Sequence, residues 1–169
     1  MSENIASISS GALKANIGLE DGARQGIVNI LCATLADQIV LRTKTQNYHW
    51  NVTGPHFRAL HLMFEEQYNE LGEVIDETAE FIRSYGSVAP GTLAEFLQIA
   101  RLKEEPGVVP DANGMIARLV ADHEAVIQNL RSDCDTIDDD YDDVAAEDYL
   151  TGLIERHLKM AWMLRSMIS

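Results

Sequence analysis

The sequence predicts an all-α protein, a four-helix bundle with a short extra helix in the long connection between the second and third long helices. Three observations lead to this prediction. Apolar residues recur every three or four positions over four long stretches, which is the period of an amphipathic helix. The alternation of apolar and polar residues that is typical of strands is scarce. Glycine and proline gather in one segment, residues 85–110, between the second and third stretches.

The first two long helices are expected on either side of a short turn. The first covers residues 21–48, where two apolar rows form one broad face. These rows are Ile27, Leu31, Leu35 and Ile39, and Val28, Cys32, Ala36 and Val40. Residues 51–55 (NVTGP) are typical of a turn, and Pro55 suits the first positions of a second helix that runs to about Ser84.

The second half of the chain holds the short helix and the other two long ones. Within the connection at residues 85–110, a helical patch is expected at 92–101. Asp111 is a suitable N-cap for a third long helix that ends near Thr136. Residues 138–143 contain five aspartates and predict an acidic break. An apolar row then carries the last helix to Ile168.

Two histidines, His123 and His157, lie on or beside the apolar rows of the last two helices. A ligand role is possible for such residues, but a hydrogen-bonded place in the core is the expected one.

Composition limits the classes of function. The chain has 169 residues, 46% of them hydrophobic, which predicts a single domain over residues 1–169 with an N-terminal extension at 1–20. Its formal charge of −14 disfavours binding to nucleic acid or anionic membranes and favours cations. No secretory signal and no apolar run of roughly 18 residues is recognised. Cys32 and Cys134 predict neither a disulfide framework nor a zinc site, so a reducing cytoplasm is the expected location.

Side chains that bind metals share one face of the second helix. With about 100° per residue, His61, Glu65, Asp76 and Glu80 fall within about 100° of one another. The rise of about 1.5 Å per residue separates His61 from Asp76 by roughly 22 Å, whereas ligands lie about 2 Å from their metal. One helix cannot form this site alone. Two antiparallel copies around a two-fold axis could. Gly72, in the middle of the face, either lets them approach closely or only weakens the helix slightly.

A further candidate ligand, His49, ends the first helix and can reach His61 because the turn between them is short. Two imidazoles and three carboxylates suit Fe²⁺, with Mn²⁺ or Zn²⁺ as possible competitors. The Glu-x-x-His pair of di-iron sites inside four-helix bundles is not found, which argues against a site of that kind.

Several motifs together resemble the Dps family, the mini-ferritins named as DNA-binding proteins from starved cells. They are residues 47–57 (NYHWNVTGPHF), 60–65 (LHLMFE), 76–83 (DETAEFIR) and 159–165 (KMAWMLR). The resemblance covers nearly the whole chain and implies a ferritin-like bundle. It also implies a ferroxidase: a hollow dodecamer of two-fold dimers that oxidises Fe²⁺, preferably with hydrogen peroxide, stores ferric mineral and protects against oxidative damage.

The resemblance assigns the ligands to subunits. His49, His61 and Glu65 would come from one chain, and Asp76 and Glu80 from its two-fold mate, with two irons in each shared site. Many members have the shorter Asp where this chain has Glu65, which leaves the position of the metal and the second iron open. Trp50 could pack at an interface or correspond to the family's tryptophan beside the iron.

The family also implies a route by which iron enters the shell. Counted back from Trp162, Asp148 takes the place of a carboxylate at a three-fold pore, with Asp139, Asp142 and Asp143 as weaker candidates. The alternative for the acidic run is a solvated loop.

The alternative function is a DNA-binding, nucleoid-protecting protein with weak or impaired ferroxidase activity. Members that bind DNA use lysine-rich tails. The first twenty residues hold only Lys14 against Glu3 and Glu20, and the chain ends seven residues after Trp162. Little or no direct DNA binding is therefore expected.

Overall fold

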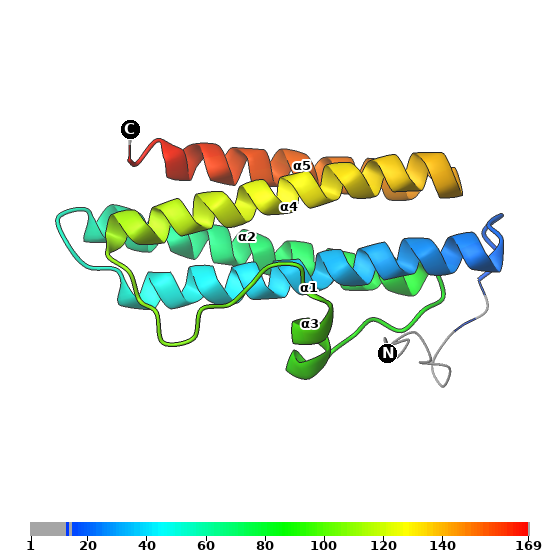
Figure 1. The fold of residues 1–169 in the computed structure, drawn as a ribbon, viewed down its shortest axis with the longest axis horizontal. Helices are drawn as coiled ribbons and strands as arrows, with labels where there is room; N and C mark the ends of the chain where they lie inside the picture. Colours follow the sequence, from blue (N-terminus) through cyan, green and yellow to red (C-terminus); the bar gives the residue numbers. More distant parts are fainter. Residues whose placement is uncertain (1–12, 14, 169) are drawn as a thin grey trace.

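The computed structural model describes residue 13 and residues 15–168, and every regular element among them is a helix. The elements are α1 (Asp21–Asn51), α2 (Phe57–Ser84), α3 (Leu93–Ile99), α4 (Ala112–Tyr141) and α5 (Val144–Arg165). The four long helices lie side by side, and α3 stands at the side of α1 (Figure 1). The predicted fold class is confirmed. Most of the expected N-terminal extension, Lys14 included, lies outside the described residues.

Side-chain caps explain where the later helices begin. The Asp111 carboxylate accepts a hydrogen bond from the Gly114 N–H at 2.8 Å, so the predicted N-cap is confirmed. Asp143 caps α5 in the same way, with acceptor bonds from the N–H groups of Ala145 and Ala146. Thr92 and Glu95 form a capping box at the start of α3.

The predicted acidic break was placed too early. α4 continues through Asp138, Asp139 and Asp140 to Tyr141, and the break is confined to Asp142 and Asp143. The last turn stays helical because Ile137 is fully buried and because Tyr141 packs so closely on Gly26 of α1 that a Cβ there would overlap its ring. The helix stops at Asp142, whose φ of 49° is left-handed, a conformation that Asp adopts more readily than most residues.

Other helix ends differ by a few residues. α1 extends to Asn51 rather than Tyr48, so Trp50 is helical, and α2 begins at Phe57, two residues after Pro55. α5 ends at Arg165, which leaves Ile168 outside the last helix.

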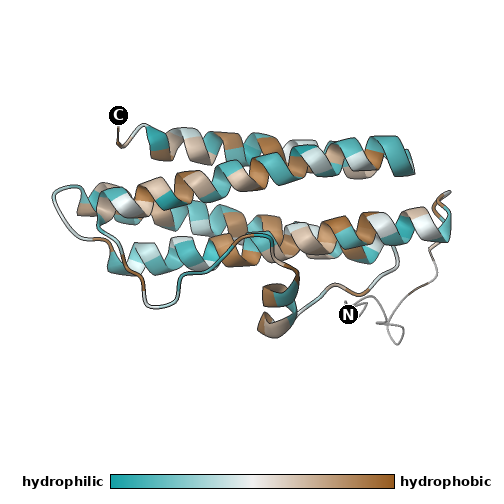
Figure 2. Ribbon diagram, viewed as in Figure 1, coloured by the Kyte–Doolittle hydropathy of each residue, from teal (hydrophilic) through white to brown (hydrophobic). Residues whose placement is uncertain are grey.

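The core runs along the whole bundle. Apolar and polar residues alternate along each long helix (Figure 2). The largest fully buried side chains come from α1, α2 and α4: Phe64, Ile27, Leu31, Leu35, Leu41, Leu60, Leu71, Ile82, Met115, Ile116, Leu119 and Leu130. α1 is long and apolar enough to cross a membrane by length and composition, but 56% of its most apolar window is buried inside the bundle. Its apolar character is thus accounted for by its place in the core.

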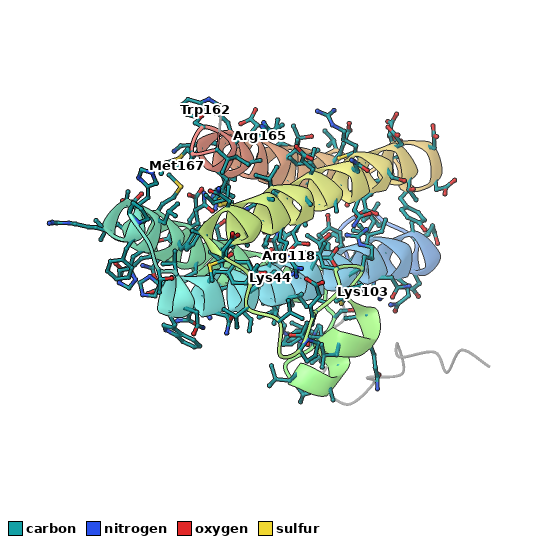
Figure 3. All side chains as sticks on the ribbon, turned by 60° about the vertical axis from the view of Figure 1, so that its left-hand side comes forward. Lys44, Lys103, Arg118, Trp162, Arg165 and Met167 are labelled. Carbon is teal, nitrogen blue, oxygen red and sulfur yellow. The ribbon has the colours of Figure 1, made fainter. Side chains whose placement is uncertain are left out.

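Ion pairs fasten the long connection to the bundle. Asp37, fully buried in α1, accepts hydrogen bonds from the backbone and guanidinium of Arg101, which also bonds Asp133 of α4 at 2.8 Å. Closer to the C-terminal end of α1, the Lys44 ammonium lies 2.5 Å from the Asp122 carboxylate and donates a hydrogen bond to the carbonyl oxygen of Lys103. Arg118 lies near Lys44 and Lys103 (Figure 3). The connection is therefore held against α1 and α4, and its residues 104–109 line a pocket together with Asn47 and Tyr48 near the C-terminal end of α1.

Candidate metal centre

Two of the predicted ligands meet where α1 turns back into α2. His49 lies in the last turn of α1 and His61 in the second turn of α2. Their imidazole rings stack with centroids 3.7 Å apart and planes inclined by 20°. The structure thus brings these two histidines together within one chain, as the short turn predicts.

Reciprocal hydrogen bonds set which nitrogen of each ring carries the proton. His49 Nδ1 lies 2.8 Å from the carbonyl oxygen of His61, and His61 Nδ1 lies 2.9 Å from the carbonyl oxygen of His49. A carbonyl oxygen can only accept, so each Nδ1–H is the donor. In the neutral ring the lone pair is then on Nε2, which is the form that a histidine takes as a metal ligand. The same bonds also clasp α1 to α2, a structural role that needs no metal.

Aromatic rings surround this pair. Tyr68 meets His49 edge to face at 5.2 Å between centroids, and Phe57 lies 5.1 Å from His61. Arg42 of α1 lies over the ring of Tyr68, with its guanidinium carbon 5.9 Å from the ring centroid. Trp50 is 66% exposed, so its two predicted roles both remain predictions. Sequence reasoning missed Tyr68 and Arg42, although each lies seven residues, two helical turns, from a predicted histidine ligand.

The three carboxylates do not join the histidines within one chain. Glu65 is one turn beyond His61 and partly exposed, whereas Asp76 and Glu80 are exposed far along α2. Among the residues that the structure describes, no three His, Cys, Asp or Glu side chains are close enough to hold one ion. A single subunit therefore offers two oriented nitrogens, an adjacent carboxylate and a separate acidic patch on the same helix.

The space over Gly72 is bordered by a side chain of the same subunit. A Cβ on Gly72 would lie 3.4 Å from Nε of Arg42, so the side chain of this chain's own α1 already covers the glycine. A methyl group would fit at this distance, so the contact does not by itself require glycine, and the close approach of a second copy at Gly72 stays a prediction.

The acidic end of the bundle combines structural and exposed carboxylates. Asp143 caps α5 and accepts a hydrogen bond from the Tyr85 hydroxyl at 2.5 Å. Burial, together with this carboxylate, raises the pKa of Tyr85. Asp139, Asp142 and Asp148 are exposed. Of the four pore candidates, Asp143 is thus committed to the fold, and the other three stay predictions.

A second histidine pair lies in the middle of the bundle. His123 and His157 are fully buried and join through their Nδ1 atoms at 2.8 Å, and Gln38 Nε2 lies 2.8 Å from His157 Nε2. Burial lowers the pKa of His157 to about 4. Burial and the neighbouring His157 lower the pKa of His123 well below its ordinary value. The expectation of hydrogen-bonded core histidines is confirmed, and these rings have no place in an exposed metal centre.

Comparison with known proteins relates the whole arrangement to one family. The model of the ferritin-like domain matches residues 28–169. A low temperature-induced protein of Nostoc sp. is 50% identical over 155 residues, which cover 92% of this chain and 87% of that protein.

Two crystal structures extend the similarity to the fold. A Dps protein from Bacillus brevis is 34% identical, with a TM-score of 0.83 over 89% of this chain and all of that one. A Dps protein from Vibrio cholerae O1, described as a member of a broad superfamily of ferritin-like diiron-carboxylate proteins, is 28% identical, with a TM-score of 0.84 over 95% of this chain and all of that one.

Proposed function

Because the chain belongs to the Dps family of ferritin-like proteins, we propose that it is a ferroxidase that oxidises Fe²⁺ at sites shared between two subunits and stores the ferric product. The observation that carries the proposal is the histidine pair at the α1–α2 turn, whose Nδ1 bonds leave both Nε2 lone pairs available. Imidazole nitrogens combined with carboxylates are a donor set that suits Fe²⁺, and Mn²⁺ or Zn²⁺ would compete for it.

The partner subunit completes the site in this proposal. His49, His61 and Glu65 of one subunit face the partner subunit's Asp76 and Glu80 across a two-fold axis, so each dimer holds two equal sites. The distance along α2 supports this division, since roughly 22 Å separate His61 from Asp76 at about 1.5 Å per residue. The longer Glu65, where many relatives have Asp, determines whether two irons are held equally well.

The substrates are Fe²⁺ and hydrogen peroxide. Two Fe²⁺ each lose one electron and one H₂O₂ accepts both while its O–O bond breaks: 2 Fe²⁺ + H₂O₂ + 2 H₂O gives 2 FeO(OH) + 4 H⁺. The histidines hold their nitrogens ready without rearrangement, and the carboxylates offset the positive charge of the two ions. Consumption of both Fenton reactants is what would protect the cell against oxidative damage.

Assembly into a hollow dodecamer would give the product a place to accumulate. The exposed Asp148 is the proposed pore carboxylate, and the net charge of −14 per subunit favours Fe²⁺ in any such channel. The cysteines Cys32 and Cys134 are free, which agrees with a reducing cytoplasm.

The test measures oxidation and assembly together. Light scattering of the purified protein is expected to give a mass far above that of the 18.8 kDa chain. After anaerobic Fe²⁺ loading, stopped-flow absorbance should show rapid ferric products on addition of peroxide. Asp76→Ala should slow this reaction strongly, while Glu104→Gln, which removes an exposed carboxylate from the connection, should not. A monomeric mass, or equal rates for wild type and Asp76→Ala, would refute the proposal.

DNA protection is the second candidate, and charge is the observation against it. Twelve copies at −14 each would repel phosphate, so we expect little or no direct DNA binding at physiological salt. A salt-sensitive mobility shift at neutral pH without divalent ions would favour this candidate instead.

A further inference from the structure

The seam between α1 and α2 carries a column of side chains in mutual contact that begins at the histidine pair. His61 stacks on His49, His49 meets Tyr68, and Arg42 lies over Tyr68. The residues come alternately from the two helices, and Gly72, one turn after Tyr68, closes the column beside Arg42. On each helix the spacing is seven residues, two turns, from His49 back to Arg42 and from His61 on to Tyr68.

A hydrogen bond at Nδ1 does not by itself orient His49. It sets which nitrogen carries the proton, but the ring can still pivot about the Nδ1···O axis and carry Nε2 away from a metal. Functional groups must be held within about 0.5 Å and 10–20° of their working geometry. The contacts with His61 and Tyr68 restrict this pivoting, and the surrounding seam leaves His49 only 8% exposed.

Arg42 and Gly72 in turn hold Tyr68. A guanidinium over an aromatic face is attracted by the negative charge of the ring face. Arg42 can occupy this position because position 72 carries no large side chain that would displace it. An added methyl would remain in ordinary contact at 3.4 Å, but a larger side chain would push the guanidinium off the ring.

We infer that Tyr68 is a positioning residue for His49, kept in place by Arg42, and that it sets the direction of His49 Nε2 toward the metal. The inference rests on the proposed function, since His49 must be a metal ligand for its direction to matter.

Co²⁺ is a suitable probe, because its visible absorption reports the geometry of its ligands and its affinity can be measured by titration without oxidation. In the assembled full-length protein, Tyr68→Leu should weaken Co²⁺ binding about tenfold and change the visible spectrum. Tyr68→Phe keeps the ring, so its Co²⁺ affinity and visible spectrum should be those of wild type. Gly72→Leu should also weaken Co²⁺ binding and change the spectrum. Gly72→Ala should bind Co²⁺ nearly as wild type does.

The controls separate this inference from the proposed function. Tyr141→Leu removes a half-buried tyrosine at the opposite end of the bundle and should leave Co²⁺ affinity and spectrum unchanged. If His49→Ala is impaired but Tyr68→Leu binds Co²⁺ like wild type with the same spectrum, the inference is wrong and the metal centre stands. If wild type and His49→Ala bind Co²⁺ equally, both are overturned.

Discussion

Two histidine pairs join helices in this molecule, and they differ in what their Nδ1 atoms contact. At the α1–α2 turn, His49 and His61 donate to backbone carbonyl oxygens, and both Nε2 atoms keep their lone pairs. In the core, His123 and His157 bond each other, and Gln38 occupies the second nitrogen of His157. A carbonyl acceptor leaves Nε2 of each turn histidine free to bind a metal, whereas both nitrogens of His157 are already bonded and Nε2 of His123 is buried without a hydrogen-bond partner.

The surroundings of the two pairs differ as well, although His49 is also buried. The core pair is fully buried, and burial keeps both of its rings neutral by lowering their pKa values. The pair at the turn lies beside the carboxylate-bearing face of α2, with Glu65 one turn beyond His61. One pair therefore serves stability, and the other is proposed to serve iron chemistry; substitutions should separate the two roles.

Replacement of a core histidine should have the largest effect. His157→Ala leaves a cavity and removes the partners of His123 and Gln38, so the free energy of unfolding should fall by about 3–5 kcal/mol. Urea unfolding at fixed protein concentration measures this loss. The rate of Fe²⁺ oxidation per folded subunit should remain that of wild type. A stable variant with a lost oxidation rate would reverse the assignment of the two pairs.

Replacement at the turn should have the opposite signature. His49→Ala removes one proposed ligand and should lower the initial rate of peroxide-driven Fe²⁺ oxidation about 100-fold. His49 is buried and donates to the His61 carbonyl oxygen, so the free energy of unfolding should also fall, by about 1–3 kcal/mol, less than for His157→Ala. Stopped-flow absorbance and urea unfolding on the same preparation give both quantities. An unchanged rate would leave the His49–His61 pair with only its clasping role.

The helices could be predicted from the sequence because their apolar period is local information, and so could the meeting of His49 and His61, because a short turn joins their helices. The end of α4 could not, since Tyr141 stays helical through a contact with Gly26, more than a hundred residues away. The tautomer of each turn histidine could not be predicted either, because hydrogen bonds to backbone carbonyl oxygens determine it. Arg42 and Tyr68 meet only once α1 and α2 are packed in register.

Acid should reduce the stability that the core pair provides. The pKa of His157 is about 4 in the folded chain and near 6.5 when unfolded, so between these values the unfolded chain binds more protons. Stability is complete above pH 6.5 and should decline by about 2 kcal/mol between pH 7 and pH 5 from this residue. His123 adds to the decline, since its pKa is lowered too.

The double variant His123→Leu/His157→Leu provides the control for this pH dependence. Urea unfolding at pH 7, 6 and 5 should show a flatter profile for this variant than for wild type. Parallel profiles for wild type and the double variant would mean that the core pair does not control acid stability.

The smallest effect is expected at Asp148, where charge rather than precise position is proposed to act. Asp148→Asn removes an exposed carboxylate from α5 and should slow Fe²⁺ uptake about threefold at low ionic strength, because a weaker negative potential concentrates fewer cations. The difference should vanish near 1 M salt, where the screening length falls to about 3 Å. Glu104→Gln makes the same change of charge far from the α4–α5 turn and should have no such salt-dependent effect. Equal slowing in both variants would reduce Asp148 to one contribution to the net charge. By contrast, the loss caused by His49→Ala should persist at every salt concentration, because a ligand acts at contact distance and is not screened.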